Sequence, residues 1–163
     1  MDTPEIRLFA PTTPEHWADA RAIFAEYAQG LGIDLAFQRF DAELASLAES
    51  YAAPEGIVLL ATVDGALAGC GAVRSLADVD YPNACEMKRL YVRRAFRRFG
   101  LGRQLAQALI DHAAGAGYSS MLLDTLDDME AARELYASLG FEEIPPYYFN
   151  PIPGAHYLRV TLG

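Results

Sequence analysis

The chain has 163 residues, 52% of them apolar, and carries a net charge of −9 at neutral pH. This composition excludes an intrinsically disordered chain, and the length predicts one domain over residues 1–163. A chain this acidic is not expected to bind nucleic acid, because such binders need broad basic surfaces. Its longest apolar run, residues 57–61, is too short to span a bilayer, so no membrane partner is expected.

Hydrophobic periodicity and turn residues divide the chain into strands and helices. Thr13 can cap a helix that has Pro14 at its first position, and Asp64-Gly65 is a strong hairpin signal between two strand-like runs. The predicted elements, in chain order, are a strand (6–10), a helix that begins at Pro14 and ends near Gly30 and Gly32, a helix (37–51), three strands (56–63, 67–75 and 85–92), a helix (100–116), a strand (120–125), a helix that follows Asp127 and stops at Gly140, and two strands (141–144 and 156–162).

The order of these elements predicts a mixed α/β fold. The strand, helix and strand around residues 100–116 imply a parallel pair of strands, whereas the hairpin implies antiparallel pairing. We therefore expect a mixed, mostly antiparallel sheet of seven strands with about four helices.

The cysteines and histidines predict neither a disulfide framework nor a metal site. Cys70 and Cys85 lie in apolar strand-like runs, and we interpret them as reduced core thiols of a cytoplasmic protein. His16, His112 and His156 do not have the spacing of metal ligands. The first residues do not have the pattern of a signal peptide.

Basic residues are concentrated in one short segment. Seven of the 13 basic residues fall between positions 88 and 103, and no acidic residue lies among them. A cationic segment on an acidic chain suggests an anionic ligand. Basic charge at a helix start opposes the helix dipole unless an anion lies between them. The seven residues are Lys88, Arg89, Arg93, Arg94, Arg97, Arg98 and Arg103.

The same segment contains a candidate phosphate-binding turn between a strand and a helix. It reads Arg97-Arg98-Phe99-Gly100-Leu101-Gly102-Arg103. Backbone N–H groups at a helix start can point at one anion, the two glycines allow close approach of the backbone, and the arginines can add charge-assisted hydrogen bonds. The turn lacks the Gly-Lys-Ser/Thr of a Walker loop and the third glycine of a dinucleotide fingerprint. The alternative is a turn whose glycines serve only helix packing.

These residues resemble the GCN5-related N-acetyltransferase (GNAT) superfamily. The turn fits the family pattern Arg/Gln-x-x-Gly-x-Gly/Ala, residues 86–92 resemble the preceding strand, and residues 131–141 match the "LYxxxGF" junction of helix and strand. The resemblance is strong over residues 84–143. It implies a fold whose two central parallel strands splay apart, acetyl-CoA as cosubstrate, and transfer of its acetyl group to an amine.

The resemblance also implies how acetyl-CoA binds. The backbone of Leu90, Tyr91 and Val92 would hydrogen-bond the pantetheine arm, much as an added strand pairs with a sheet edge. The thioester would lie in the gap between the splayed strands, where a backbone N–H near Tyr91 or Val92 can polarise its carbonyl. The pyrophosphate would be held by Arg97, Arg98, Phe99, Gly100, Leu101, Gly102 and Arg103.

Two residues resemble the family's catalytic groups. An alkyl amine is mostly protonated at neutral pH, and Glu86 could accept its proton directly or through water. Strand alternation predicts that Glu86 shares a face with Lys88, Leu90 and Val92. The alternative role for Glu86 is an ion pair with a neighbouring Lys or Arg. Tyr136 matches the position that assists the departing thiolate, and its alternative role is that of a core aromatic residue.

The acceptor site is predicted less sharply. An aromatic, proline-rich loop over residues 145–154 precedes the last strand, and in resembling enzymes this loop often walls the acceptor pocket. A second wall could come from the first two helices, and an aromatic lining would suit a cation or an apolar body. The alternative for each residue is ordinary packing. The candidates are Tyr27, Phe37, Phe40, Tyr147, Tyr148 and Asn150.

The leading hypothesis is an acetyl-CoA-dependent N-acetyltransferase that acts on a primary amine of a small molecule or peptide. The alternatives are acetylation of a protein lysine or N-terminus, a non-catalytic CoA-binding sensor, and a nucleotide-binding enzyme of another class. The sequence leaves open the acceptor, the acyl chain and whether the chain forms a homodimer.

Overall fold

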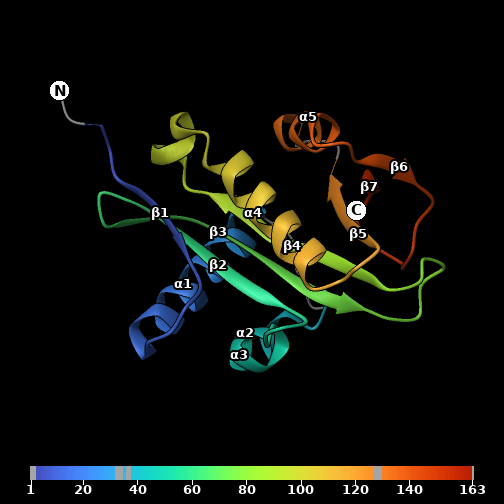
Figure 1. The fold of residues 1–163 in the computed structure, drawn as a ribbon, viewed down its shortest axis with the longest axis horizontal. Helices are drawn as coiled ribbons and strands as arrows, with labels where there is room; N and C mark the ends of the chain where they lie inside the picture. Colours follow the sequence, from blue (N-terminus) through green and yellow to red (C-terminus); the bar gives the residue numbers. More distant parts are fainter. Residues whose placement is uncertain (1–2, 32–34, 36–37, 127–129, 163) are drawn as a thin grey trace.

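Seven strands and the helices that cover them make up the computed structural model, which describes residues 3–31, 35, 38–126 and 130–162. In chain order the elements are β1 (Ile6–Phe9), α1 (Pro14–Leu31), α2 (Phe40–Ala45), α3 (Leu47–Ser50), β2 (Ile57–Val63), β3 (Ala66–Leu76), β4 (Ala84–Val92), the 3₁₀ helix η2 (Arg94–Phe99), α4 (Leu101–Gly115), β5 (Ser120–Leu126), α5 (Glu130–Ser138), β6 (Glu142–Ile144) and β7 (Ala155–Thr161). The strands form one sheet in the order β1-β2-β3-β4-β5-β7-β6 (Figure 1). Among the described strands, β4 and β5 are the one parallel pair and the other pairs are antiparallel, which confirms the predicted mixed sheet.

Local signals position most elements as predicted. Each strand agrees with its predicted range to within one residue at either end. Thr13 Oγ1 accepts a hydrogen bond from His16 N at 3.1 Å, as expected of a helix cap. Asp64 and Gly65 both have positive φ, which is the backbone of the tight hairpin turn between β2 and β3. Asp127, the residue before the predicted fourth helix, lies outside the described residues.

The helix count is a correction to the prediction. The described residues contain five α-helices and one 3₁₀ helix rather than about four helices. The predicted helix over residues 37–51 is divided at Ser46, whose φ and ψ are −140° and 45°. Its hydroxyl donates a hydrogen bond to the Ala42 carbonyl at 2.9 Å, which offers the backbone a local alternative to the helix ladder. The 3₁₀ helix η2 was not predicted.

Helices cover both faces of the sheet (Figure 1). On one face, α4 buries Leu101, Leu105 and Leu109 completely against the strands. Helix α5 contributes Tyr136 to the same cluster. On the other face, Ile23 and Phe24 of α1 are fully buried in a second cluster that includes α2 and α3. The predicted apolar stripes of the helices therefore form two cores, one on each side of the sheet.

The two parallel strands splay apart, as the family resemblance implied. Their pairing runs from Ala84 opposite Ser120 to Glu86 opposite Leu122 and then ends. Strand β4 nevertheless continues to Val92 and β5 to Leu126. Beyond Glu86, β4 is therefore not paired with β5, and the carbonyl of Val92 near its end accepts a hydrogen bond from the Arg97 side chain instead.

A β-bulge in β4 corrects the predicted orientation of its side chains. Arg89 has φ 60°, and the register with β3 shifts between Cys70 and Ala72. An extra residue in one strand reverses the alternation that follows it. Leu90 and Val92 consequently pack against the core under α4, and the prediction that they share a face with Glu86 and Lys88 is wrong.

A buried ion pair fastens α2 to the bulge. Arg89 Nε and Nη2 donate to the two carboxylate oxygens of Glu43, each at 3.0 Å, and both residues are buried. Arg89 Nη1 also donates to Gln38 Oε1 at 2.7 Å. The guanidinium lies 5.0 Å from the ring centroid of Phe40 and 5.9 Å from that of Tyr27. A bidentate pair of this kind is short and strong, so it fixes the helices over the splayed end of β4.

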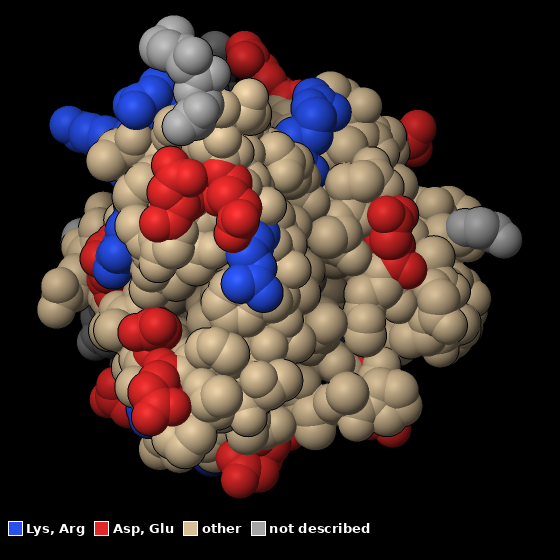
Figure 2. Space-filling view, turned by 60° about the vertical axis from the view of Figure 1, so that its left-hand side comes forward, with Lys and Arg blue, Asp and Glu red and all other residues tan. Residues whose placement is uncertain are grey.

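Two observations concern the exterior. In the part of the chain that the structure describes, no helix is both long and apolar enough to cross a membrane. Figure 2 shows one face, on which acidic and basic side chains form small separate groups on a largely uncharged surface. The coloured atoms of that face form no continuous basic band.

We expect Glu43→Gln to lower the free energy of unfolding by ~3–5 kcal/mol, because it leaves the Arg89 charge buried without its partner. The double variant Arg89→Met and Glu43→Leu is expected to lose less free energy of unfolding than Glu43→Gln, because neither buried charge remains. Urea unfolding followed by circular dichroism measures both values, with Glu49→Gln on the exposed face of α3 as control. Equal losses in the single and double variants would contradict this account.

Candidate functional site

The predicted phosphate turn forms a helix start with free backbone donors. Gly100 has a left-handed backbone, φ 70°, and α4 begins at the next residue. The first hydrogen bond of the helix runs from Gln104 N to the Gly100 carbonyl at 3.2 Å. The N–H groups of Leu101, Gly102 and Arg103 precede it and have no acceptor within the helix, so they are available to an anion.

Packing does not account for the two glycines of the turn. A Cβ on Gly100 would meet nothing within 4 Å, and only its positive φ favours glycine. A Cβ on Gly102 would lie 3.6 Å from Leu135 Cδ2, which is an ordinary contact. Helix packing therefore does not require glycine at either position, and only Gly100 is favoured as glycine by its backbone.

The cationic segment divides into two groups, which revises the interpretation that all seven charges await one ligand. Lys88 and Arg89 are buried, and Arg93 forms an ion pair with Glu26 at 3.0 Å. Since these three charges face the protein's own carboxylates, they are not available to an external anion. Four arginines remain exposed around the turn: Arg94, Arg97, Arg98 and Arg103.

The three predicted arginines of the turn are held by local contacts. Arg97 Nε donates to the Val92 carbonyl at 3.0 Å, and Arg98 stacks on Phe99 at 4.7 Å. Arg103 Nη2 donates to Ser138 Oγ of α5 at 2.7 Å. Each guanidinium therefore stays near the helix start while its other N–H groups can reach an anion.

Glu86 is buried and bonded through both carboxylate oxygens. Arg74 Nη2 lies 3.0 Å and Lys88 Nζ 3.8 Å from Oε1, while the Tyr147 hydroxyl donates to Oε2 at 2.7 Å. The side chain is 2% exposed. The ion pair considered as the alternative role of Glu86 is thus present, and Tyr147 connects the carboxylate to the surface of the molecule.

A second carboxylate, Asp124, lies beyond the splay point on β5. Its Oδ2 accepts hydrogen bonds from the Tyr148 hydroxyl and from Asn150 Nδ2, the latter at 3.0 Å. Gln38 extends this network, because its Nε2 donates to the Tyr148 hydroxyl at 3.1 Å and its Oε1 accepts from Lys88 Nζ at 3.2 Å. Polar groups from the segment before α2, from β4, from β5 and from the loop before β7 therefore converge.

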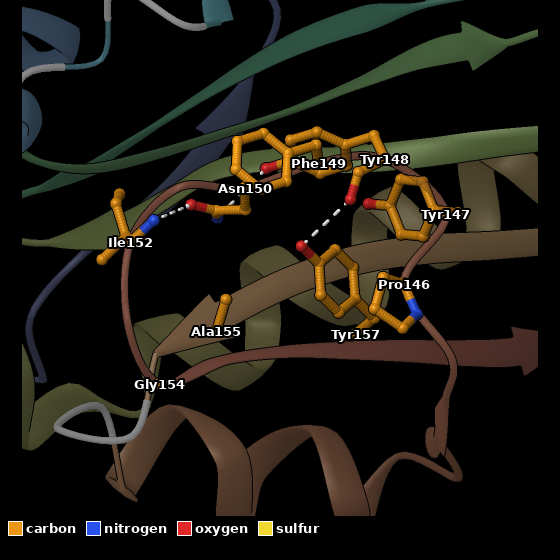
Figure 3. A pocket seen from close by; sticks show the side chains of 9 residues that line it. All are labelled: Pro146, Tyr147, Tyr148, Phe149, Asn150, Ile152, Gly154, Ala155 and Tyr157. Carbon is orange, nitrogen blue, oxygen red and sulfur yellow. Dashed lines mark hydrogen bonds between the residues drawn. The ribbon is translucent and has the colours of Figure 1, made fainter.

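The loop before β7 borders a shallow hollow of about 630 Å³ that is open to solvent, which we call the tyrosine cavity (Figure 3). The rings of Tyr147, Tyr148 and Tyr157 lie 5.3 to 5.7 Å apart by their centroids. Figure 3 shows Tyr157 projecting from β7 toward the other two. The lining is Pro146, Tyr147, Tyr148, Phe149, Asn150, Ile152, Gly154, Ala155 and Tyr157.

The residues predicted to form the second wall of the acceptor pocket do not face the tyrosine cavity. Tyr27 and Phe40 contact the guanidinium of Arg89, and neither lines the tyrosine cavity. Phe40 is 8% exposed, and burial raises the pKa of Tyr27 to about 12. This placement fits the alternative of core packing. Phe37 lies outside the described residues.

Tyr136 combines core packing with a place near the site. It is 7% exposed and packs edge to face on Phe141 at 5.5 Å. Burial raises its pKa, and the electrostatic influence of Tyr27 and Asp124 raises it further. Its hydroxyl consequently stays protonated at neutral pH and can act as a hydrogen-bond donor.

Sequence reasoning missed Asp124, Gln38, Arg74 and Tyr157 as members of the site. A polar residue at the end of the buried run Met121-Leu122-Leu123, where a strand leaves its partner, was a usable signal for Asp124. Gln38, Arg74 and Tyr157 lie in no distinctive local sequence pattern. They belong to the site through contacts with residues that are distant in the sequence.

Cysteine chemistry has no support in this region. Cys70 and Cys85 are free and buried in different cores, and burial raises the pKa of Cys85 to about 12. A thiol with such a pKa is inert at neutral pH. Among the described residues no group of three or more His, Cys, Asp or Glu side chains could hold a metal ion.

Comparison with known proteins gives consistent matches. Residues 17–141 match the model of the acetyltransferase (GNAT) family. An uncharacterized N-acetyltransferase of Schizosaccharomyces pombe is 42% identical, over 100% of this chain and 99% of that protein. An IAA acetyltransferase of Azospirillum brasilense is 31% identical, over 70% of this chain and 73% of that protein.

Solved structures share the fold. A GNAT-family acetyltransferase of Staphylococcus aureus, 18% identical, has a TM-score of 0.76 and covers 98% of this chain and 100% of its own. A Salmonella typhimurium protein described as an acetyltransferase, solved with acetyl-CoA, is 22% identical with a TM-score of 0.71, over 97% of this chain and 94% of that one. The family match over residues 17–141 and the 42% identical relative show that the chain belongs to the GNAT family of N-acetyltransferases.

Proposed function

We propose that this acyltransferase moves the acetyl group of acetyl-CoA to a primary amine of a small molecule or peptide. The observation that carries the proposal is the end of the β4–β5 pairing at Glu86 and Leu122, beyond which β4 is not paired with β5. The anion-binding helix start of α4 follows β4 in the chain, and the tyrosine cavity connects to Glu86 through Tyr147. One domain over residues 1–163 carries the activity in this proposal.

Acetyl-CoA binding is assigned to the turn and to the edge of β4. The N–H groups of Leu101, Gly102 and Arg103 bind the pyrophosphate, and the exposed guanidinium groups beside them add charge-assisted hydrogen bonds. The backbone of Leu90, Tyr91 and Val92 bonds the pantetheine arm as a strand would. A thioester bound there supplies the acetyl group.

Glu86 serves as the base through Tyr147. At 2% exposure its carboxylate does not line the tyrosine cavity, whereas Tyr147 does and bonds to it at 2.7 Å. Tyr147 accepts a proton from the amine on its hydroxyl oxygen while passing its own proton to Glu86. Burial raises the pKa of Tyr147, and Glu86 and Asp124 raise it further, so the residue relays the proton without resting as a tyrosinate.

Tyr136 stabilises the leaving sulfur. The pKa of a thiol is ~8.5, far below that of this buried tyrosine, so full proton transfer from Tyr136 to a thiolate is uphill. A hydrogen bond from the hydroxyl is sufficient to lower the energy of the developing negative charge. Tyr136 therefore acts as a donor that keeps its proton.

The function is tested by release of free CoA thiol from acetyl-CoA across a panel of amino acids, polyamines, aminoglycosides and short peptides. We expect one class of small amine to stimulate release. Tight binding of acetyl-CoA without stimulation by any amine would identify a CoA-binding sensor instead. Stimulation only by folded proteins would favour a protein acetyltransferase.

We expect Gly102→Ala to weaken acetyl-CoA binding without loss of stability. The new Cβ makes only an ordinary contact, and alanine favours a helix over glycine by roughly 0.5–1 kcal/mol. Loss of one close backbone contact to phosphate should weaken binding by about tenfold or more. Calorimetric titration and thermal unfolding measure the two effects.

Gly115→Ala is the matched control, because it adds a methyl group to the other end of α4 where a Cβ meets nothing within 4 Å. It should leave acetyl-CoA affinity unchanged. If both variants bind acetyl-CoA normally, the turn does not hold the phosphates.

We expect Glu86→Gln to slow turnover by roughly 10²–10⁴-fold, the usual contribution of a general base. Acetyl-CoA affinity should change little, and the acid limb of the pH–rate profile should disappear because the proton acceptor is gone. Tyr147→Phe should cause a similar loss, and the double variant should be no slower than either single one if the two residues act as one relay. Steady-state rates between acid and alkaline pH provide the measurement.

Glu49→Gln is the control for this experiment, because it removes a carboxylate from the exposed face of α3. The shape of its pH–rate profile should match that of the parent chain. An unchanged profile in Glu86→Gln would remove Glu86 as the base.

A further inference from the structure

The carboxylate of Glu86 has different partners on its two oxygens. Arg74 donates to Oε1 twice, from Nε at 3.1 Å and from Nη2 at 3.0 Å. Lys88 Nζ also lies on the side of Oε1, at 3.8 Å. The Tyr147 hydroxyl donates to Oε2 at 2.7 Å. Positive charge is therefore gathered at one oxygen, and the hydroxyl that connects the carboxylate to the surface meets the other.

The sheet itself places Arg74 beside Glu86. The two residues are directly opposite each other in the antiparallel ladder of β3 and β4, where the register is regular. Side chains of a directly opposite pair lie on the same face of a sheet and within reach of one another. The shift in register comes only beyond the pair of Ala72 and Lys88, so the bulge does not disturb this contact. The ion pair thus depends on paired backbone rather than on a loop.

Lys88 is less suited to hold the carboxylate. Its Nζ is 3.8 Å from the nearer Glu86 oxygen and 3.2 Å from the side-chain oxygen of Gln38, so its hydrogen bond goes to the amide. An ammonium is also a point charge, whereas a guanidinium is a planar fork that fixes direction as well as charge. Arg74 is therefore the residue that determines how the carboxylate of Glu86 is turned.

Burial makes this contact important for the reaction. A carboxylate removed from water binds a proton more readily unless a positive charge stabilises its ionised form. Glu86 is 2% exposed, and a base must be ionised before the proton of the amine arrives. A proton that comes through Tyr147 meets Oε2, while Oε1 is occupied by Arg74. Charge and orientation of the carboxylate thus both depend on the same guanidinium.

We propose that Arg74 is a positioning residue for catalysis, which keeps the buried carboxylate of Glu86 ionised and turns its Oε2 toward Tyr147. The proposal rests on the proposed acetyl transfer, in which Glu86 is the base. Arg74 acts through Glu86 rather than on the acceptor or on acetyl-CoA. It supplies a charge and a geometry, and substitution can separate the two.

Other charged and titratable groups surround this ion pair, and a substitution at Arg74 leaves them in place. Glu43 of α2 and Tyr51, which follows α3, influence Arg74, while Asp124 of β5 influences Lys88 and Tyr147. The groups that face the pair are Glu43, Tyr51, Cys85, Lys88, Arg89, Asp124, Tyr147 and Tyr148.

The test compares Arg74→Met, which removes both charge and fork, with Arg74→Lys, which keeps a charge without the fork. In Arg74→Met the acid limb of the pH–rate profile should move to higher pH by about one unit, because Glu86 binds a proton more readily. This shift is small for an arginine beside a carboxylate, since the Arg74 side chain is 37% exposed. Arg74→Lys should keep the acid limb in place. In both variants kcat on the plateau should fall about tenfold, because the carboxylate is no longer held in one orientation, and the KM for acetyl-CoA should be unchanged.

The control is Arg7→Met, which removes an exposed positive charge from β1 and should keep the parent profile. A loss of rate in Arg74→Met that is equal at every pH would indicate a purely structural role and would overturn the proposal. An acid limb that moves as far in Arg74→Lys as in Arg74→Met would overturn it too, because the lysine retains the charge. Arg74→Gln replaces Arg74→Met if that variant does not fold.

Carbon-13 NMR of chains labelled at the glutamate side-chain carboxyl tests the proposal without turnover. The Glu86 resonance is assigned by its absence from Glu86→Gln. The midpoint of its titration should lie at higher pH in Arg74→Met than in the parent chain and should be little changed in Arg74→Lys. That result would support the effect of Arg74 on Glu86 even if no amine is acetylated. Equal midpoints in the parent chain and Arg74→Met would exclude it.

Discussion

The end of parallel pairing between β4 and β5 is the constraint on which the site depends. Up to Glu86 and Leu122 the two strands share a ladder, and beyond them the two strands are not paired with each other. Unpaired backbone groups at such a position need a partner, and an extended pantetheine arm can supply one. The turn that follows β4 presents helix N–H groups at the same end of the strand. In the proposed function, one interruption of the sheet therefore serves both the pantetheine arm and the pyrophosphate.

The bulge at Arg89 determines which side chains reach each face beyond this point. It sends Leu90 and Val92 into the core under α4, and it leaves the Arg89 guanidinium bonded to Glu43 on the opposite face. The helices that cover that face are thereby fixed against the strand. Glu86 and Lys88 lie before the bulge, and they remain in the polar network with Gln38 and Tyr147.

Features set by neighbouring residues could be predicted from the sequence, while those set by distant ones could not. The Thr13 cap, the Asp64-Gly65 turn and the glycine turn before α4 depend on a few consecutive residues, and the periodicity of the strands is similarly local. The bulge at Arg89 is stabilised by Glu43, which lies 46 positions earlier. The break at Ser46 interrupts an apolar stripe that continues through the predicted helix. Asp124 receives its two hydrogen bonds from Tyr148 and Asn150, which lie in the loop before β7. The ion pair considered as the alternative role of Glu86 is present, but the burial of Glu86 behind Tyr147 depends on that same loop.

The short ladder between β4 and β5 also has a mechanical meaning. The two parts of the sheet, β1 to β4 and β5 to β7, are joined along this seam by three residue pairs. The two parts are therefore joined less by ladder hydrogen bonds than by the core under α4, which contains side chains from both of them, such as Val73 and Leu123. A ligand lying in the gap and bonded to both parts would add a second connection, on the side of the backbone.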